Sequence, residues 1–420
     1  MPWSILKRLV KPLLPRDYRA AARSFTSDAW RYLGVAAMQN AGFGILGTVF
    51  AIYLKSAGLS EAVVGDVEGA LAIGSAITCL ALPPLVTRVG YRPLIIVAAL
   101  ALGLSRLGQV IVPGAMAIVA LGLLYGVGEG SMQTISTAFL AGNAPARART
   151  HLFTVDYTLR VGSMFVGALM GGFLPDLLGK GGLGELPAYR ATIAIGALFM
   201  AGSLVPALHI EHSRPAVHAV SYLASIRAFT SWGRLGRLLV PETLISFGAG
   251  LSMPFVALFL NHRLGASVNQ VGMIQAASSI GMAAAAFGAP FLARRLGLVG
   301  AVVTTELLSL PFLVLVPLAT GLPVAAALLL VRGILMNMSW PVYNQLAIEG
   351  VASADRPLVV GWVRFGWSIA WFGGSVIGGR LMMLSYTLPW YLTAAFYATG
   401  ALSTFFLLRG VHTEASSGQW

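Results

Sequence analysis

Three charged residues, Glu129, Asp156 and Arg160, lie within the otherwise apolar stretch 121–172. A short basic link at 144–149 divides this stretch into two arms. If both arms are helical, Glu129 and Arg160 lie about equally far from the link, and Asp156 lies one turn from Arg160. An ion in hydrocarbon is costly unless it is paired or faces water, so we predict one functional charge cluster. Its carboxylates would exchange an arginine partner, a proton and a substrate; the alternative is a permanent ion pair that joins the two helices.

The composition is that of a membrane protein. Hydrophobic residues make up 57% of the 420 residues and charged residues only 10%, far below the average of about 25% in soluble proteins. The single cysteine, Cys79, excludes an internal disulfide and any multi-cysteine metal site, and the six histidines are scattered along the chain. We therefore predict a polytopic helical protein that carries no metal and no cofactor.

The chain contains an internal repeat. A shift of 207 residues places identical residues on one another over most of a half-chain. The matched pairs include Gly58 with Gly265, Gly65 with Gly272, Gly90 with Gly297, Arg149 with Arg356, Gly167 with Gly374, and Gly172 with Gly379. One constant offset over this length indicates two tandem copies of one unit.

Apolar runs of membrane-spanning length predict twelve helices, six in each copy. Their ranges are 31–55, 61–87, 92–112, 114–143, 148–175, 188–209, 236–262, 268–294, 298–319, 322–351, 357–382 and 385–409. An even number of crossings in each half makes the two six-helix halves, 31–209 and 236–409, parallel repeats. Residues 1–30 and 410–420 would be tails, and the polar, basic segment 210–235 would link the halves.

Basic residues are distributed unevenly between the two predicted sides. Most of the 28 Lys and Arg fall in the tails and in alternate loops, among them Arg88, Arg92, Arg147, Arg149 and Arg356. This positive-inside bias predicts that both termini are cytoplasmic, in a plasma membrane of the bacterial inner-membrane type. It also explains the net charge of +13 without a nucleic-acid partner.

The loop after the second predicted helix, 82–93, has a copy in the repeat at 288–297. It resembles the signature cytoplasmic loop of the major facilitator superfamily, and Arg88, Gly90 and Arg92 fit that pattern. Val86 and Thr87 stand where the signature has an acid. The resemblance implies alternating access by rocking of two halves around a central cavity lined by the first, fourth, seventh and tenth helices.

The resemblance also predicts which residues of the first half line that cavity. If Glu129 and Gly130 replace the glutamine and glycine of the fourth-helix antiporter motif, its arginine position falls on Gly126, beside Tyr125. Gln39 and Asn40 on the first helix are neutral hydrogen-bonding candidates. At the outer end of the second helix, Asp66 and Glu68 suit either a solvated mouth or a coupling site.

In the second half, two arginines and a group of aromatic residues lie inside predicted helices. Arg332 and Arg364 differ in depth by roughly 15 Å, so they are suited to bind an anionic substrate one after the other during transit. Alternatively, Arg364 could extend its side chain to the nearby membrane surface. Glu242 and Glu306 are candidate partners for Arg364. The residues predicted to form the wall of a ligand site are Asn337, Trp340, Tyr343, Asn344, Trp367 and Trp371. For any one of the tryptophans, the alternative role is packing against lipid.

These features predict a secondary transporter that moves a small organic solute, with protons as the coupling partner. Export of amphipathic compounds is favoured by the aromatic wall and Glu129, and carriage of organic anions by Arg332 and Arg364. A lipid scramblase or receptor with no coupled flux is a third reading. An enzyme is not expected, because no nucleophile and base fall at one depth. We expect a monomer.

Overall fold

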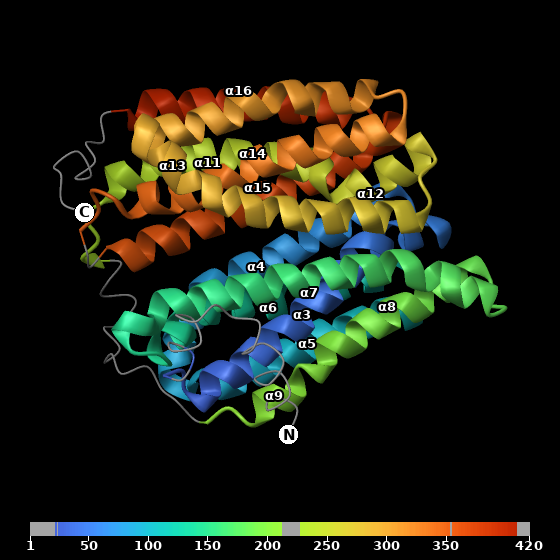
Figure 1. Cartoon of the computed structure of the whole chain (residues 1–420), viewed down its shortest axis with the longest axis horizontal. Coiled ribbons are helices and arrows are strands. Elements are labelled where there is room, and N and C mark those ends of the chain that lie inside the picture. Colours follow the sequence, from blue (N-terminus) through green and yellow to red (C-terminus); the bar gives the residue numbers. More distant parts are fainter. Residues whose placement is uncertain (1–21, 23, 212–226, 353–354, 410–420) are drawn as a thin grey trace. The chain divides into compact units, whose positions relative to one another are not determined.

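The structure is a computed structural model that describes residue 22 and residues 24–211, 227–352 and 355–409. Every regular element within these residues is a helix (Figure 1). Residues 1–21, most of the predicted linker and the tail 410–420 lie outside the described residues.

The first repeat contains six long helices and one short one. Thr26 caps the first of them, its side-chain oxygen accepting a hydrogen bond from the Ala29 N–H. The helices are α3 (Ser27–Ser56), α4 (Glu61–Val89), α5 (Tyr91–Ile111), α6 (Ala115–Gly142), α7 (Ala146–Lys180), α8 (Glu185–Gly202) and α9 (Leu204–Leu208).

The second repeat follows the same plan. Its first span begins as α11 and continues through a 3-10 turn, the short α12 and a π-helical turn that ends at Arg263. The helices are α11 (Trp232–Ser252), α12 (Val256–Leu258), α13 (Val268–Leu315), α14 (Leu322–Ile348), α15 (Arg356–Leu384) and α16 (Leu388–Leu408).

The helix α13 contains two of the predicted spans. They join at Gly297, whose positive φ of 71° breaks the helical backbone. Its repeat partner Gly90 has a φ of 82° and separates α4 from α5. The loop glycines Gly58 and Gly265 match in the same way, with φ values of 84° and 67°. A residue with a Cβ is disfavoured in this region, so the repeat preserves glycine at its turns.

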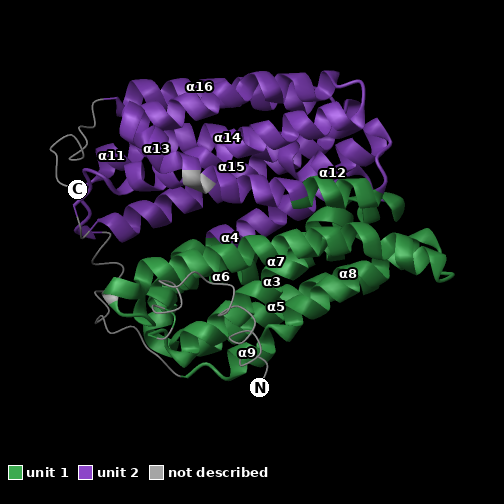
Figure 2. Cartoon of the chain, in the orientation of Figure 1, with its two compact units in different colours: residues 1–57, 77–219, 268–276 green, residues 58–76, 220–267, 277–420 purple. Residues whose placement is uncertain are grey.

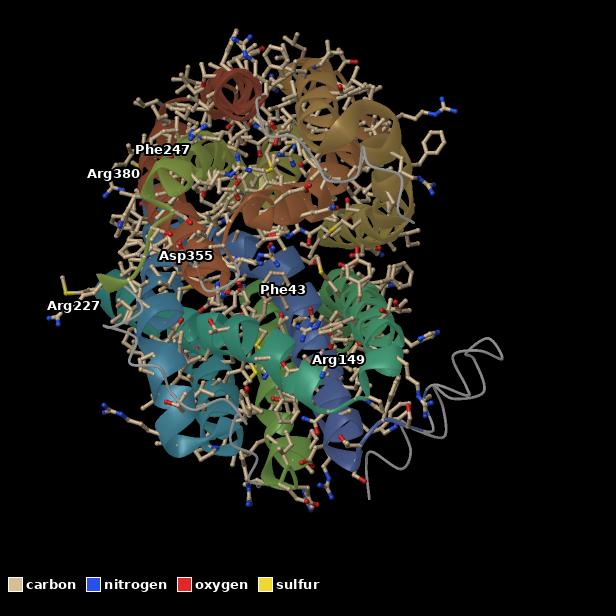
Figure 3. All side chains as sticks on the ribbon, turned by 90° about the vertical axis from the view of Figure 1, so that its left-hand side faces the viewer. Phe43, Arg149, Arg227, Phe247, Asp355 and Arg380 are labelled. Atoms are coloured by element: carbon tan, nitrogen blue, oxygen red, sulfur yellow. The ribbon has the colours of Figure 1, made fainter. Side chains whose placement is uncertain are left out.

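A side-chain contact also recurs at the 207-residue offset. The Nε of Arg149 donates to the Ala144 carbonyl at 3.4 Å, and the Nε of Arg356 donates to the Val351 carbonyl at 3.2 Å. Both contacts lie where the fourth helix of a repeat turns into the fifth, and Arg149 is labelled in Figure 3. The predicted twelve-helix plan of two repeats is therefore confirmed.

Counted over the described residues, ten helices are long and apolar enough to cross a membrane. α15 and the first part of α13 lie outside that set. α15 carries Arg356, Arg364 and Arg380 within its length, which lowers its apolar character.

The chain divides into two compact units, coloured separately in Figure 2. Unit 1 contains 1–57, 77–219 and 268–276, and unit 2 contains 58–76, 220–267 and 277–420. The start of α4 thus clusters with the second repeat, and the start of α13 with the first.

Glycines explain this exchange. A Cβ added at Gly65 of α4 would lie 2.3 Å from the Ser375 carbonyl oxygen and 3.1 Å from the Gly379 Cα, so α4 and α15 cross in backbone contact. A Cβ at Gly272 of α13 would lie 2.7 Å from the Gly172 Cα of α7. The 207-residue offset relates the two crossings. In both, small residues let two membrane helices approach closely.

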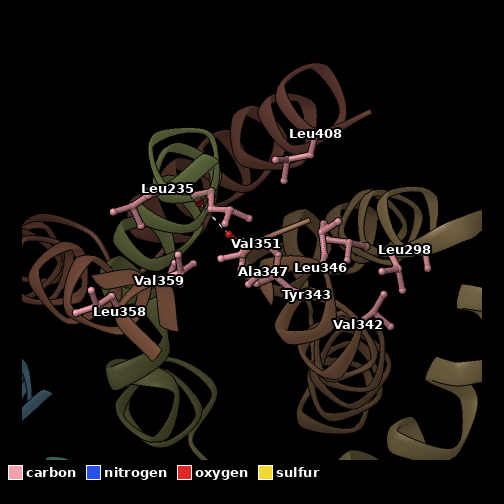
Figure 4. Close-up of a cluster of buried hydrophobic side chains, with 14 of the residues drawn as sticks. Leu235, Leu298, Val342, Tyr343, Leu346, Ala347, Val351, Leu358, Val359 and Leu408 are labelled. Carbon is pink, nitrogen blue, oxygen red and sulfur yellow. Dashed lines mark hydrogen bonds between the residues drawn. The ribbon is translucent and has the colours of Figure 1, made fainter. Parts of the chain in front are cut away.

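A cluster of buried apolar residues in unit 2 lies where α11, α13, α14, α15 and α16 converge (Figure 4). Leu238, Val302, Leu346 and Val359 are fully buried in it. Tyr343 is part of this cluster, and its hydroxyl donates to the Leu238 carbonyl at 2.8 Å.

Candidate functional site

The predicted charged hairpin of unit 1 contains the Asp156–Arg160 ion pair. The Arg160 Nε donates to Asp156 Oδ2 at 2.7 Å, one turn along α7. A second guanidinium nitrogen lies 3.5 Å from the Tyr32 hydroxyl of α3. Asp156 is buried, and its Oδ1 has no hydrogen-bond partner within the described chain. The predicted pairing of Asp156 with Arg160 is present, with Tyr32 as an additional member.

Glu129, the third member of the predicted cluster, lies on α6. It accepts a hydrogen bond from the Gln133 side chain at 3.0 Å, one turn further along that helix. The side chain is half-buried. An amide donor stabilises a carboxylate without neutralising its charge.

Two other predicted solute contacts of the first half are packed within unit 1. Tyr125 is 1% exposed and lies against the guanidinium of Arg106, which is 3.9 Å from its ring centroid. Gln39 is buried and donates to the Ser203 hydroxyl at 3.3 Å. Asn40 is half-buried and donates to the Ala36 carbonyl within its own helix. For Tyr125 and Gln39, packing therefore leaves little surface for a solute.

Arg106 was not among the predicted site residues. It is 4% exposed on α5, lies over both the Phe50 and Tyr125 rings, and donates to Gln109 at 2.8 Å. Two aromatic faces and an amide thus replace a carboxylate partner. The signal in the sequence was a lone arginine within the apolar run 94–112.

In unit 2, the three predicted tryptophans form one contiguous group. Trp340 of α14 meets Trp367 of α15 edge to face, with centroids 5.3 Å apart. Trp367 stacks on Trp371 at 6.1 Å. The Arg364 guanidinium lies 5.0 Å from the Trp340 centroid. All four side chains are half-buried, so the group has both packed and accessible surface.

The polar members of the predicted wall divide into two groups. Tyr343 is 4% exposed within the apolar cluster, so its bulk serves packing and only its hydroxyl has a polar role. Asn337 and Asn344 each donate to the carbonyl one turn back in α14, those of Gly333 and Trp340.

Arg332 lies deeper in α14 and is engaged by α16. Its guanidinium donates to the Tyr397 hydroxyl at 2.6 Å and lies 5.4 Å from the Tyr397 ring centroid. Its Nε is buried and has no hydrogen-bond partner among the described residues. Arg332 is thus oriented by Tyr397 but retains one unused donor.

The buried carboxylates of unit 2 are Glu242 on α11 and Glu306 on α13, which are 5% and 4% exposed. Arg364 acts electrostatically on Glu242, as the sequence suggested. Glu242 in turn acts on Glu306. Their side chains come from helices about 60 residues apart in sequence, and their proximity depends on helix rotation, which apolar periodicity leaves open.

Asp66 lies at the α4–α15 crossing. It forms an ion pair with Arg380 at 2.8 Å, and Arg380 is labelled on α15 in Figure 3. Glu68 lies half a turn further along α4. Near the same end, Tyr386 hydrogen-bonds Glu61, and burial together with this carboxylate raises the pKa of the Tyr386 hydroxyl. The repeat-related crossing in unit 1 has Met273 and Phe173 at the positions of Asp66 and Arg380.

The predicted gating loop joins α4 to α5. Gly90 supplies its left-handed turn, Arg88 is exposed, and Arg92 donates to the Leu208 carbonyl at 2.8 Å. Arg92 thereby ties the start of α5 to the end of α9.

At the start of α15, Asp355 accepts hydrogen bonds from the hydroxyls and backbone N–H groups of Ser231 and Thr230. These bonds, of which the Ser231 hydroxyl is the strongest influence, lower the pKa of the Asp355 carboxyl. The contact fixes the entry of α11 against the α14–α15 turn.

Within the described part of the chain, no group of three or more His, Cys, Asp or Glu could hold a metal ion.

The chain matches the family model of the Major Facilitator Superfamily over residues 32–237 and 242–419. No curated protein matches it. Among solved structures it is similar to the nucleoside transporter NupG (15% identity, TM-score 0.74, covering 91% of this chain and 99% of that one). It is also similar to a bacterial homologue of the human lysosomal transporter Spinster (14%, 0.73, 95% and 98%). A third similar structure is a D-xylose-proton symporter (16%, 0.70, 93% and 99%).

The family match covers nearly the whole chain, and the structural similarity extends over both repeats. The protein belongs to the Major Facilitator Superfamily. It is a multi-pass integral membrane protein with the fold of a transporter rather than of an enzyme.

Proposed function

We propose that the protein exports amphipathic, aromatic organic compounds in exchange for protons, by alternating access in a bacterial inner membrane. Both termini would be cytoplasmic and the functional unit a monomer. The observation that carries the proposal is the tryptophan group of Trp340, Trp367 and Trp371 with Arg364 beside it.

This group has the chemistry of an aromatic binding surface. Trp367 lies eleven residues into α15, roughly 16 Å along the helix and near the middle of a hydrocarbon core about 30 Å thick. Tryptophans that anchor a protein at the membrane interface lie near helix ends, so interfacial anchoring does not account for this one. Indole faces bind flat apolar rings, and half-buried ones retain surface for a ligand.

Arg364 gives this surface a polar edge. Its guanidinium lies against Trp340 and within the field of Glu242. A solute with an aromatic body and a hydrogen-bonding group would place the body on the indoles and its polar group toward Arg364.

Carriage of organic anions is the second candidate. It is favoured by the buried Nε of Arg332, which lacks a hydrogen-bond partner among the described residues. Against it, Arg332 already donates a hydrogen bond to Tyr397, and Arg364 interacts electrostatically with Glu242.

Binding to the purified protein tests the proposal. We would measure the affinity for ethidium, an amphipathic aromatic cation, and for 1-naphthoate, an aromatic anion. Trp367→Ala is expected to weaken ethidium binding about tenfold, or about 1.4 kcal/mol, which is the scale of one lost aromatic contact. The matched control is Trp232→Ala, because Trp232 is 53% exposed at the start of α11. Equal losses in both variants would contradict the proposal, and binding of 1-naphthoate alone that is lost in Arg332→Ala would favour the anion carrier.

A further inference from the structure

Two glutamates of unit 2 are buried at similar positions along α11 and the second span of α13. Glu242 is ten residues from the start of α11, and Glu306 is nine residues beyond the Gly297 break in α13. Both side chains therefore lie roughly 15 Å from the ends of their spans. Each is at least nine-tenths buried.

Glu242 has partners that suit an ionised carboxylate. Arg364 of α15 acts on it with opposite charge, and the Tyr343 hydroxyl of α14 lies within hydrogen-bonding reach. The same hydroxyl donates to the Leu238 carbonyl. Since a hydroxyl has one proton, Tyr343 can donate to Glu242 or to Leu238, and in the second case it can only accept from a protonated Glu242. The site thus accommodates both states of Glu242.

The surroundings of Glu306, by contrast, do not suit an ionised carboxylate. The charge that acts on it is Glu242, which has the same sign. Within the described chain, no lysine or arginine forms an ion pair with Glu306, and its buried Oε2 has no hydrogen-bond partner. The Tyr397 hydroxyl, which accepts a hydrogen bond from Arg332 at 2.6 Å, does not donate to this Oε2.

A carboxylate with no cation beside it is much more costly to bury than a carboxylic acid. Two carboxylates facing each other cannot both ionise cheaply, and one arginine neutralises only one of them. The unused Oε2 of Glu306 is where a proton would reside.

We propose that Glu306 and Glu242 form a proton-binding site in which Glu306 holds the proton while Glu242 is ionised under the electrostatic influence of Arg364. Transfer of that proton from the Glu306 carboxyl to the Glu242 carboxylate would leave Glu306 ionised and Arg364 without its counter-charge. Arg364 lies against Trp340, so proton movement would change the charge presented beside the tryptophan group. This coupling step rests on the proposed function, whereas the bound proton itself does not.

The hairpin of unit 1 offers a contrast. Asp156 already has Arg160 as a bonded counter-ion at 2.7 Å, so that pair is neutral without a proton. Asp156 therefore serves as the matched buried carboxylate for the test.

Infrared difference spectroscopy of the purified protein, between neutral and strongly alkaline samples, detects a protonated carboxyl group directly. The wild type is expected to show the carboxyl stretching band at neutral pH. Glu306→Gln should lose it, while Glu242→Gln and Asp156→Asn should keep it, because Glu306 still lacks a cation in both. A wild type without the band, or a band that persists in Glu306→Gln or disappears in Asp156→Asn, would overturn the assignment. The amide bands of each sample verify that the variant is folded.

A second measurement separates this site from the proposed function. In proteoliposomes with the protein's ethidium transport as readout, Glu306→Gln should abolish accumulation driven by a pH gradient but leave ethidium exchange at equal pH within about twofold. Absence of ethidium transport in the wild type would contradict the proposed function and leave the infrared result to decide the proton site. Gradient-driven accumulation that survives in Glu306→Gln would contradict a coupling role for the site.

Discussion

The packing of α7 against α3 leads to a prediction whose size follows from the structure. A Cβ at Gly167 would lie 2.0 Å from the Ala41 carbonyl oxygen of α3, whereas real Cβ contacts are essentially never under 3.0 Å. The two helices would have to separate by about 1 Å at this point. Overpacking of this kind costs about 1–3 kcal/mol. We therefore expect Gly167→Ala to destabilise the protein by that amount.

Gly162 provides the matched control on the same helix. A Cβ there would meet nothing within 4 Å. Gly162→Ala should therefore stabilise the protein by about 0.8–1 kcal/mol, because alanine has a higher helix propensity than glycine. Unfolding of the two variants in detergent, titrated with sodium dodecyl sulfate, measures both effects. Equal stabilities for Gly167→Ala and Gly162→Ala would refute the close helix contact.

Two further predictions concern loops and helix ends. Asp66→Asn should lower the free energy of unfolding by less than about 1 kcal/mol, because both side chains of the Asp66–Arg380 pair are partly exposed. The double exchange Asp66→Arg with Arg380→Asp should recover most of this stability. A loss of stability that does not depend on salt concentration would argue against an ion pair. The pKa of the Asp355 carboxyl is lowered in the folded protein. The stability that the ionised carboxylate contributes is therefore present above its ordinary pKa near 3.8 and is lost as the pH falls through the folded-state pKa. Asp355→Asn should therefore flatten the acid limb of the stability profile, and an unchanged limb would show that the bonds from Ser231 and Thr230 contribute nothing.

The sequence was sufficient for the architecture, because the features that define it are local. Apolar length sets each span, and a glycine with positive φ marks the turn after the second helix of each repeat. Gly90 and Gly297 could therefore be matched from sequence and are found as equivalent breaks. The same holds for Arg149 and Arg356, which bond to equivalent carbonyls.

Side-chain partners between helices were harder to predict. Asp156 and Arg160 were paired correctly because they are one turn apart on one helix. Asp66 and Arg380 form an ion pair, and Glu242 and Glu306 interact electrostatically, across helices distant in sequence. Such pairings depend on helix rotation and depth. In a chain with an apolar majority, the hydrophobic pattern hardly constrains that rotation, because most faces of each helix are apolar.

Tyr343 shows a related limit. Its position beside Trp340 suggested a ligand wall, yet it lies in the apolar cluster with only its hydroxyl engaged (Figure 4). A tyrosine on an apolar helix suits both roles, and the neighbours supplied by α11 and α15 decide between them.

The central claim, proton-coupled movement of an amphipathic solute, is tested most directly by proton flux. Purified protein in liposomes would be given ethidium, and the internal pH followed with a trapped dye, for the wild type and for Glu129→Gln and Glu306→Gln. The account predicts ethidium-dependent proton movement in the wild type that Glu306→Gln abolishes. Ethidium transport with no accompanying proton movement in the wild type would contradict it.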